Sequence, residues 1–227
     1  MLLNSQPVFT PLNLPNCKLW LDATQTPLGA VATWNDLSGN SNNATQVTSI
    51  DRPVCSASQW NGLNALTFNG SQGMDLPSAL YAIPNGNSTA FIVTNTALDT
   101  TFQRILNWQN GGGSILFAGF QPSSGVISYG NGSAPTIGSI TKSNMNIIIG
   151  RISGTTQGVS INGGAEANNA SYTNALATSA FIGGISPGNQ PLIGDIGELL
   201  IYNRTLSSVE IAAVDSYLRN KWSIVLS

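Results

Sequence analysis

The feature that most limits the fold of this chain is a series of short apolar runs separated by Asn and Gly. Each run has the length and the content of Val, Ile, Leu and Phe that is typical of a β-strand. The regular spacing favours an antiparallel sandwich in which tight connections join neighbouring strands. The runs are 18–22, 65–69, 90–96, 104–108, 114–120, 145–152, 159–162, 180–183 and 193–202.

The breaks between these runs have the chemistry of tight turns. Asn-Gly pairs stand at 61–62, 69–70, 85–86, 131–132 and 162–163. Both residue types tolerate the positive φ angles that two-residue hairpin loops require. The sequence therefore predicts several β-hairpins.

One segment has a helical period instead. Ser207 and Glu210 fit a capping box, in which each residue satisfies a backbone N–H of the other. Apolar residues follow at helical spacing, namely Ile211, Val214, Leu218 and Trp222. We expect an amphipathic helix over 208–222 that lies against the sandwich, within one domain that spans 18–227.

Residues 1–17 precede the first predicted strand, and three prolines interrupt them. A central strand does not accommodate such prolines, so this segment is expected to be an extended N-terminal arm. Its apolar side chains are candidates for contact with a neighbouring subunit of an assembly. They are Val8, Phe9, Leu12 and Leu14.

Charged residues make up 8% of the 227 residues, against about a quarter in a usual soluble domain. The formal net charge is −2 and His is absent. These counts argue against binding to nucleic-acid phosphates and exclude Ser-His-Asp triads and imidazole metal ligands. Apolar residues at 41% suffice for a core. The polar surface is then mostly neutral, and we expect its contacts to depend weakly on salt.

Two cysteines and the chain end give little information on compartment. Cys17 and Cys55 can form a disulfide or remain buried thiols, and both alternatives stay open. The first residues lack the basic and apolar regions of a secretory signal, and no run has the length of a membrane span. We therefore expect neither a signal peptide nor membrane insertion.

Four segments, in order along the chain, resemble the concanavalin A-like, laminin-G-like jelly-roll domains. They are Leu19-Trp20-Leu21-Asp22-Ala23, residues 34–44, residues 61–70 and residues 193–210. The resemblance covers about 18–222. It implies an all-β fold, an antiparallel two-sheet jelly-roll sandwich of the concanavalin A-like lectin/glucanase type. The family includes lectin-like, adhesive, enzymatic and virion proteins, so the resemblance leaves function open.

An enzyme of the glycosidase class needs two facing carboxylates, and laminarinase-like relatives place glutamates along one strand. Here Glu198 lies in the closing strand without an acidic residue two positions away. Asp195 is three positions away, which in a regular strand places it on the opposite face. We therefore expect no catalytic residues and no enzyme, with Glu198 as the one carboxylate to test.

A calcium site is the second alternative, since laminin-G-like relatives can bind calcium at the rim of the sandwich. Asp36, together with Asn35, Asn40 and Asn42, supplies oxygen donors. A single carboxylate offers little charge, and Asx residues often bond to their own backbone in turns. We favour the turn, and so expect no metal site and no cofactor.

Aromatic residues divide into expected core and expected ligand contacts. The strand and helix positions predict core packing for Trp20, Trp34, Tyr202 and Trp222. Other aromatic residues stand beside turns, where a ring can contact a sugar. The main candidates for such a contact are Trp60, Trp108 and Tyr129, and Tyr172 is a further one.

Three functional classes remain: a structural protein, a carbohydrate-binding module and an enzyme. The sequence favours a structural virion surface component of a bacteriophage or other virus, such as a capsid decoration or tail fibre protein. Its partners would be coat or other virion proteins, and its location the virion. The alternative is a lectin-like module that binds host or environmental glycans.

Overall fold

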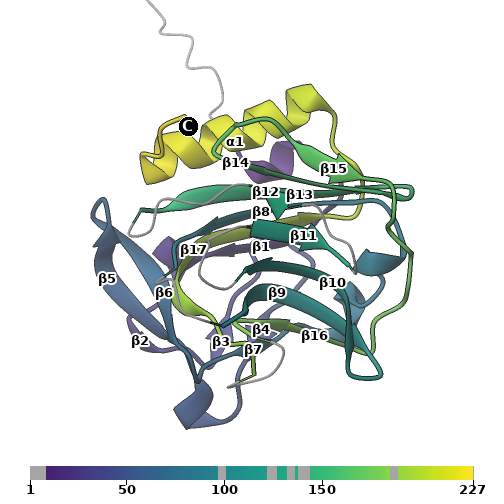
Figure 1. Cartoon of the computed structure of the whole chain (residues 1–227). Coiled ribbons are helices and arrows are strands. Elements are labelled where there is room, and N and C mark those ends of the chain that lie inside the picture. Colours follow the sequence, from purple (N-terminus) through teal and green to yellow (C-terminus); the bar gives the residue numbers. More distant parts are fainter. Residues whose placement is uncertain are drawn as a thin grey trace, which may run out of the picture.

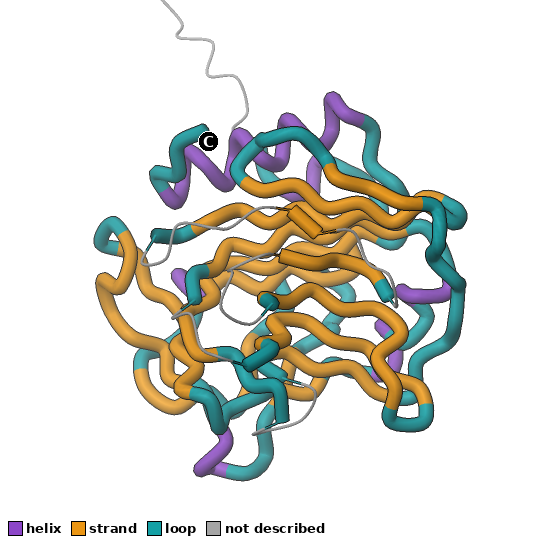
Figure 2. The backbone as a smooth tube through the Cα atoms, viewed as in Figure 1, coloured by secondary structure: helices purple, strands orange, loops and turns teal. Residues whose placement is uncertain are grey.

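A computed structural model describes residues 9–96, 101–121, 127–131, 136–137, 144–184 and 189–226. In this part of the chain two antiparallel β-sheets lie face to face, and a C-terminal helix covers the outer face of one of them (Figure 1). The two-sheet sandwich with a C-terminal helix, predicted from the sequence, is confirmed. Figure 2 shows how much of the backbone is strand.

The sheet next to the helix is called sheet A, and the other is sheet B. Among the described residues sheet A has nine strands, with β1 (Cys17–Asp22) paired to β17. The others, in spatial order, are β15 (Ala167–Asn169), β14 (Thr156–Ile161), β13 (Asn146–Ser153), β8 (Ser88–Thr94), β17 (Ile193–Tyr202), β6 (Leu63–Asn69), β5 (Val54–Trp60) and β2 (Gly29–Ala30).

Sheet B has eight strands in the described part of the chain. In spatial order they are β12 (Thr136–Ile137), β11 (Ile127–Gly130), β10 (Gly113–Phe120), β9 (Gln103–Asn110), β16 (Ser179–Ile182), β7 (Met74–Asp75), β4 (Ala44–Thr45) and β3 (Thr33–Trp34). Short 3₁₀ turns connect some strands, namely η1 (Pro11–Asn13), η2 (Ala23–Gln25), η3 (Ser49–Asp51), η4 (Ser78–Leu80) and η5 (Ile83–Asn85).

The central strands of sheet A are buried on both faces. Their inner side chains meet sheet B, and outer side chains such as Phe91, Ile147 and Leu200 are covered from the helix side. Strands covered on both faces have continuous apolar runs rather than alternation. This is why 90–93, 147–149 and 199–201 are almost wholly apolar.

Helix α1 (Ser208–Trp222) covers that outer face. The predicted capping box is present, because the Ser207 hydroxyl accepts from the Glu210 N–H and the Glu210 carboxylate accepts from the Ser207 N–H. Glu210 also pairs with Arg204 at 2.7 Å. The buried residues of the helix face sheet A, and they are Val214, Leu218 and Trp222.

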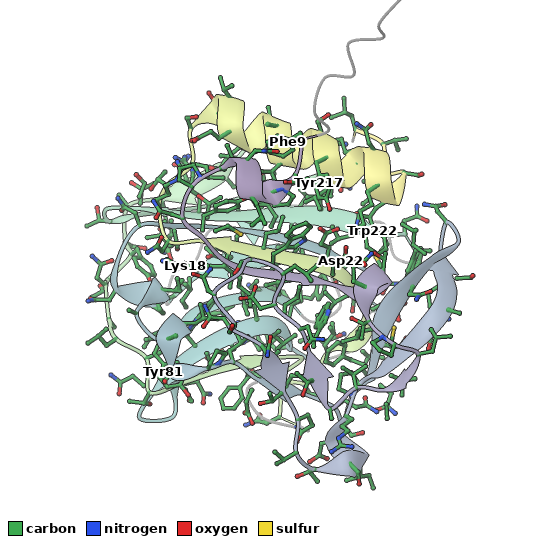
Figure 3. All side chains as sticks on the ribbon, turned by 180° about the vertical axis from the view of Figure 1, so that it is seen from behind. Phe9, Lys18, Asp22, Tyr81, Tyr217 and Trp222 are labelled. Carbon is green, nitrogen blue, oxygen red and sulfur yellow. The ribbon has the colours of Figure 1, made fainter. Side chains whose placement is uncertain are left out.

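Residues 9–16 differ from the predicted extended arm. They include the turn η1, and Phe9 and Leu14 pack against the chain's own helix-side apolar cluster. Phe9 lies beside Tyr217 (Figure 3), with ring centroids 6.4 Å apart. Leu12 is 48% exposed, and Val8 lies outside the described residues. The chain's own cluster therefore partly buries Phe9 and Leu14, and contact with a neighbouring subunit stays a prediction.

The cysteines are both buried free thiols, so the disulfide alternative is not realised. Burial raises the pKa of the Cys17 thiol to about 12 and also raises the pKa of Cys55. No helix in the described ranges has the length and apolar content needed to cross a membrane.

Gly197 in β17 allows Trp222 to pack closely on sheet A. A Cβ atom at this position would lie 2.5 Å from the Trp222 ring. We expect Gly197→Ala to lower the free energy of unfolding by about 1–3 kcal/mol, because the core would be overpacked. Chemical denaturation measures this, with Gly86→Ala as control, since a Cβ there meets open space. Equal effects of the two substitutions would contradict the packing argument.

The Arg204 and Ser207 contacts lower the pKa of Glu210 from 4.5 to about 2. An acid with a lowered folded-state pKa stabilises the fold fully above its ordinary pKa, and this contribution is lost as pH falls toward 2. We expect the melting temperature of the wild type to fall more steeply than that of Glu210→Gln between these two values. Parallel melting curves across that pH window would refute the role of the capping box.

Candidate functional site

A pocket of about 400 Å³ opens at the edge of sheet A beside the end of α1. Two hairpin turns and the last described residues of the chain surround it. Every lining residue is uncharged, and most are amides or apolar groups. The lining consists of Trp60, Asn61, Asn144, Met145, Asn146, Asn162, Trp222, Ser223, Ile224, Val225 and Leu226.

Both turns are Asn-Gly pairs that the sequence predicted as hairpins. Asn61 and Gly62 have φ angles of 49° and 78°, and Asn162 and Gly163 have 48° and 72°. Positive φ at both central residues is the pattern of a type I′ turn. Gly163 also packs closely against the end of the Arg219 side chain, because a Cβ there would lie 2.5 Å from the Arg219 guanidinium.

Trp60 ends β5, and hydrogen bonds fix the orientation of its ring. The indole Nε1–H donates to Oδ2 of Asp195 at 3.1 Å. The other oxygen of Asp195 accepts from the Thr67 hydroxyl at 2.6 Å. Because Asp195 takes up the indole N–H, the partly buried ring contributes an apolar surface to the pocket.

The amides of the pocket are linked to one another and to the backbone. Asn61 Nδ2 donates to the Trp222 carbonyl at 2.7 Å, and Asn162 Nδ2 donates to Asn146 Oδ1 at 2.9 Å. Asn162 Oδ1 accepts from the Ile147 N–H at 2.8 Å. These bonds hold neutral polar groups beside the Trp60 ring before any ligand arrives.

Trp222 also lines the pocket, and the carboxylate of Glu198 fixes its indole ring. Oε2 of Glu198 accepts from Trp222 Nε1 at 2.9 Å and from Lys221 Nζ at 2.7 Å. Oε1 accepts from Trp20 Nε1 at 2.7 Å and from the Tyr217 hydroxyl at 2.9 Å. Burial raises the pKa of this carboxyl, against the opposing effect of the Lys221 ammonium.

The expectation that Asp195 and Glu198 point to opposite faces is wrong. The pairing of β17 with β8 shifts register between Ile196 and Glu198, which indicates a β-bulge. The extra residue turns both carboxylates toward the helix-covered face, where each bonds to a tryptophan that lines the pocket. Glu198 has four protein donors, which occupy the acceptor sites of an ionised carboxylate.

Trp60 is the one sequence-predicted ligand contact among the three main candidates that lines this pocket. Trp108 and Tyr129 are fully buried between the sheets, and the Trp108 indole donates to the Leu80 carbonyl at 3.0 Å. Tyr172 is also buried. The burial of these residues removes the exposed ring face on which the prediction of ligand contact depended. Trp34, Tyr202 and Trp222 are core residues as predicted, whereas Trp20 is partly exposed.

Asp36 organises a turn, as the sequence analysis favoured. Its carboxylate accepts from the Trp20 N–H, from the N–H and hydroxyl of Ser38, and from the Asn42 N–H, at 2.7–2.9 Å. Asn40 Nδ2 donates to a β1 carbonyl. Among the residues that the structure describes, no group of three or more Cys, Asp or Glu side chains is placed to hold a metal ion.

The pocket amides escaped the sequence analysis because they come from three separate segments. Asn144 and Asn146 flank the start of β13, while Asn61 and Asn162 belong to hairpins. The Asn-Gly turns were visible as local signals. Their meeting at one edge depends on strand order, which no local pattern specifies.

No family model and no curated protein matches this sequence. Solved structures do resemble its fold. Trypanosoma rangeli sialidase in complex with sialic acid is 18% identical, with a TM-score of 0.65 over 92% of this chain. The match spans 33% of the sialidase chain, so this chain corresponds to about a third of that enzyme's length.

Two further structures match over nearly their whole length. Domain 4 of AbnA, a GH43 extracellular arabinanase from Geobacillus stearothermophilus, was solved with arabinotriose. It is 16% identical, with a TM-score of 0.63 over 88% of this chain and 98% of that domain. The CBM40 of Ruminococcus gnavus IT-sialidase, bound to α2,3 sialyllactose, is 18% identical, with a TM-score of 0.54 over 66% of this chain and 95% of that one.

These likenesses show a sandwich fold of the jelly-roll kind. They also correct the expectation that the chain is not an enzyme, since the neighbours include sialidases. The structures named above give no support to the predicted virion role.

The buried Glu198–Lys221 pair should be essential to stability. The Glu198 carboxylate accepts from four buried or partly buried donors, and a glutamine replaces one of its two acceptor oxygens by an NH2 group. Donors that lose their acceptor are costly, so Glu198→Gln should lower the free energy of unfolding by about 3 kcal/mol, although Lys221 keeps Asp22 as a partner. Urea unfolding measures it, with Glu166→Gln as control, because the Arg151–Glu166 pair is more exposed and should cost under about 1 kcal/mol. A small, equal loss in both variants would show that the network is dispensable.

Proposed function

We propose that this chain binds neutral oligosaccharides through the pocket beside Trp60. The observation that carries the proposal is the pairing of an orientationally fixed indole ring with uncharged amides in one concave site. Ligand sites of this kind combine an apolar wall with a few placed polar groups.

The chemistry of a pyranose or furanose matches such a site. One face of the sugar presents C–H groups, which pack on an aromatic ring, and its edge presents hydroxyls, which bond to amides or bridging waters. The Trp60 ring supplies the first contact, and the exposed amides of Asn61 and Asn144 supply the second. Because no lining residue is charged, a neutral glycan loses no ionic solvation on binding.

The comparisons support a carbohydrate ligand in general. The arabinanase domain was solved with arabinotriose, which is a neutral oligosaccharide, and the CBM40 with a sialylated one. We infer that this sandwich belongs to the concanavalin A-like, laminin-G-like kind, as the sequence resemblance implies. Binding of host or environmental glycans is therefore preferred to attachment to coat proteins, and the virion location stays a prediction.

The experiment is a glycan array followed by calorimetry with the best neutral oligosaccharide, arabinotriose included. Trp60→Ala should weaken binding about tenfold or more, because the stacking surface is lost, while Trp60→Phe should keep part of the affinity. The control is Val47→Ala, at an exposed residue outside the pocket. Binding should change little with added salt.

Two results would count against this function. The first is an array without any neutral glycan bound by the folded wild type. The second is equal affinity in Trp60→Ala, Val47→Ala and wild type, which would place the sugar elsewhere on the chain.

A further inference from the structure

A row of side chains crosses the outer face of sheet B, on the far side of the sandwich from the Trp60 pocket. In the strand register, Phe117 of β10 pairs with Asn107 of β9, Asn107 pairs with Phe181 of β16, and Phe181 pairs with Asp75 of β7. Paired residues point to the same face of a sheet. Strands lie about 4.8 Å apart, so the row is roughly 14 Å long, which suits a short oligosaccharide.

Asn107 is the unusual member of this row. Its side chain is 0% exposed, yet neither its amide nitrogen nor its amide oxygen has a hydrogen-bond partner. Buried polar groups are almost always bonded, and an unsatisfied one destabilises the fold. Two partly exposed rings, Phe117 and Phe181, flank it. The fold therefore keeps an amide that nothing within the described structure satisfies.

Arg104 lies over one end of the row. Its guanidinium carbon is 3.5 Å from the centre of the Phe117 ring, and Nε donates to Gln190 Oε1 at 2.9 Å. Among the described residues no ion pair includes Arg104, whereas Arg151, Arg204 and Arg219 pair with carboxylates and Arg52 bonds to backbone carbonyls. Burial lowers its pKa to about 10, so it stays cationic at neutral pH. A stacked guanidinium keeps its in-plane N–H donors available at its edge.

We propose that the row Arg104, Phe117, Asn107, Phe181 and Asp75 is a second binding site, which takes a saccharide that carries a carboxylate. The Arg104 fork keeps its stack on Phe117 and pairs with the carboxylate, while the Phe181 ring packs against the sugar. Asn107 donates to and accepts from the sugar's polar groups once the rings part. Asp75 is exposed at the other end of the row and accepts from hydroxyls.

The charges decide between an acidic and a neutral ligand here. Arg104 has no acidic partner within the described part of the chain and so favours an anion, whereas no residue that lines the Trp60 pocket is charged. The Asp75 carboxylate at the opposite end repels an acidic group, so the acidic end of the ligand lies at Arg104 and its hydroxyls lie at Asp75. The two sites lie on different sheets and share no residue, so each can fail without the other.

The test measures binding of sialyllactose and of trigalacturonic acid to the full chain by calorimetry. Lactose and the methyl ester of trigalacturonic acid are the matched neutral probes. We expect each acidic probe to bind more tightly than its neutral counterpart, and more weakly as salt rises. Arg104→Gln and Asn107→Leu should each lose about tenfold or more in affinity, and Arg104→Lys should lie between.

Controls separate this site from stability and from the Trp60 pocket. Arg52→Gln, at an arginine that bonds backbone carbonyls in another loop, should bind the acidic probes as the wild type does. Trp60→Ala should also bind the acidic probes with the affinity of the wild type. Asn107→Leu should melt at the same or a higher temperature, because an unsatisfied amide is removed.

Equal binding of acidic and neutral probes would overturn the proposal. Loss of acidic binding in Trp60→Ala would also overturn it, by assigning the ligand to the other pocket. So would a lower melting temperature of Asn107→Leu together with unchanged binding, because that result gives Asn107 a purely structural role.

Discussion

The carboxylate of Glu198 is the point on which the arrangement of this protein depends. It is buried in β17 and accepts hydrogen bonds from Trp20 of β1 and from Tyr217, Lys221 and Trp222 of α1. Lys221 also reaches Asp22 at 2.6 Å. A buried charge is tolerated when it is paired and fully hydrogen-bonded. The Glu198 carboxylate meets these conditions and joins β17 to β1 and to α1. Asp22 and Trp222 are labelled in Figure 3, near one end of the helix.

The position of the helix in turn determines which residues line the uncharged pocket beside Trp60. Trp222 is its last residue, and the Asn61 amide bonds to the Trp222 carbonyl. The chain then turns through Ser223, with φ of 54°, and the following residues line the pocket together with Trp60. The few charged residues thus hold the framework together. Neutral amides and rings line the pocket beside Trp60, for which we propose a neutral ligand, and this gives the low charge content a physical meaning.

Features that depend on local chemistry could be predicted from the sequence. The capping box at Ser207, the apolar face of α1 and the Asn-Gly turns at 61–62 and 162–163 each involve residues close in the chain, and the structure has them. The predicted turn at 85–86 is wrong, because Asn85 ends η5 and Gly86 is extended, while Gly132 lies outside the described residues. Strand β5 was missed because its residues are largely exposed and polar, and residues 9–16 were misjudged because their packing partner is the distant helix.

Site residues were harder to predict, because burial and register are properties of the whole fold. Trp108 and Tyr129 stand next to polar turns, yet their strands direct both rings inward. The bulge that brings Asp195 and Glu198 to one face left no local signal. Asn107 is one Asn among many in the sequence, and its special position appears only when β10 and β16 are paired on either side of it.

The most direct test of the central claim is a titration of the ¹⁵N-labelled chain with a neutral oligosaccharide, followed by NMR. The Trp60 indole N–H is bonded to Asp195 at the pocket, whereas the Trp108 indole is buried between the sheets. The account predicts that the Trp60 indole resonance and the side-chain amides of Asn61 and Asn162 shift in a saturable manner, while the Trp108 indole stays in place. Saturable shifts that leave Trp60 and these amides unmoved would contradict it.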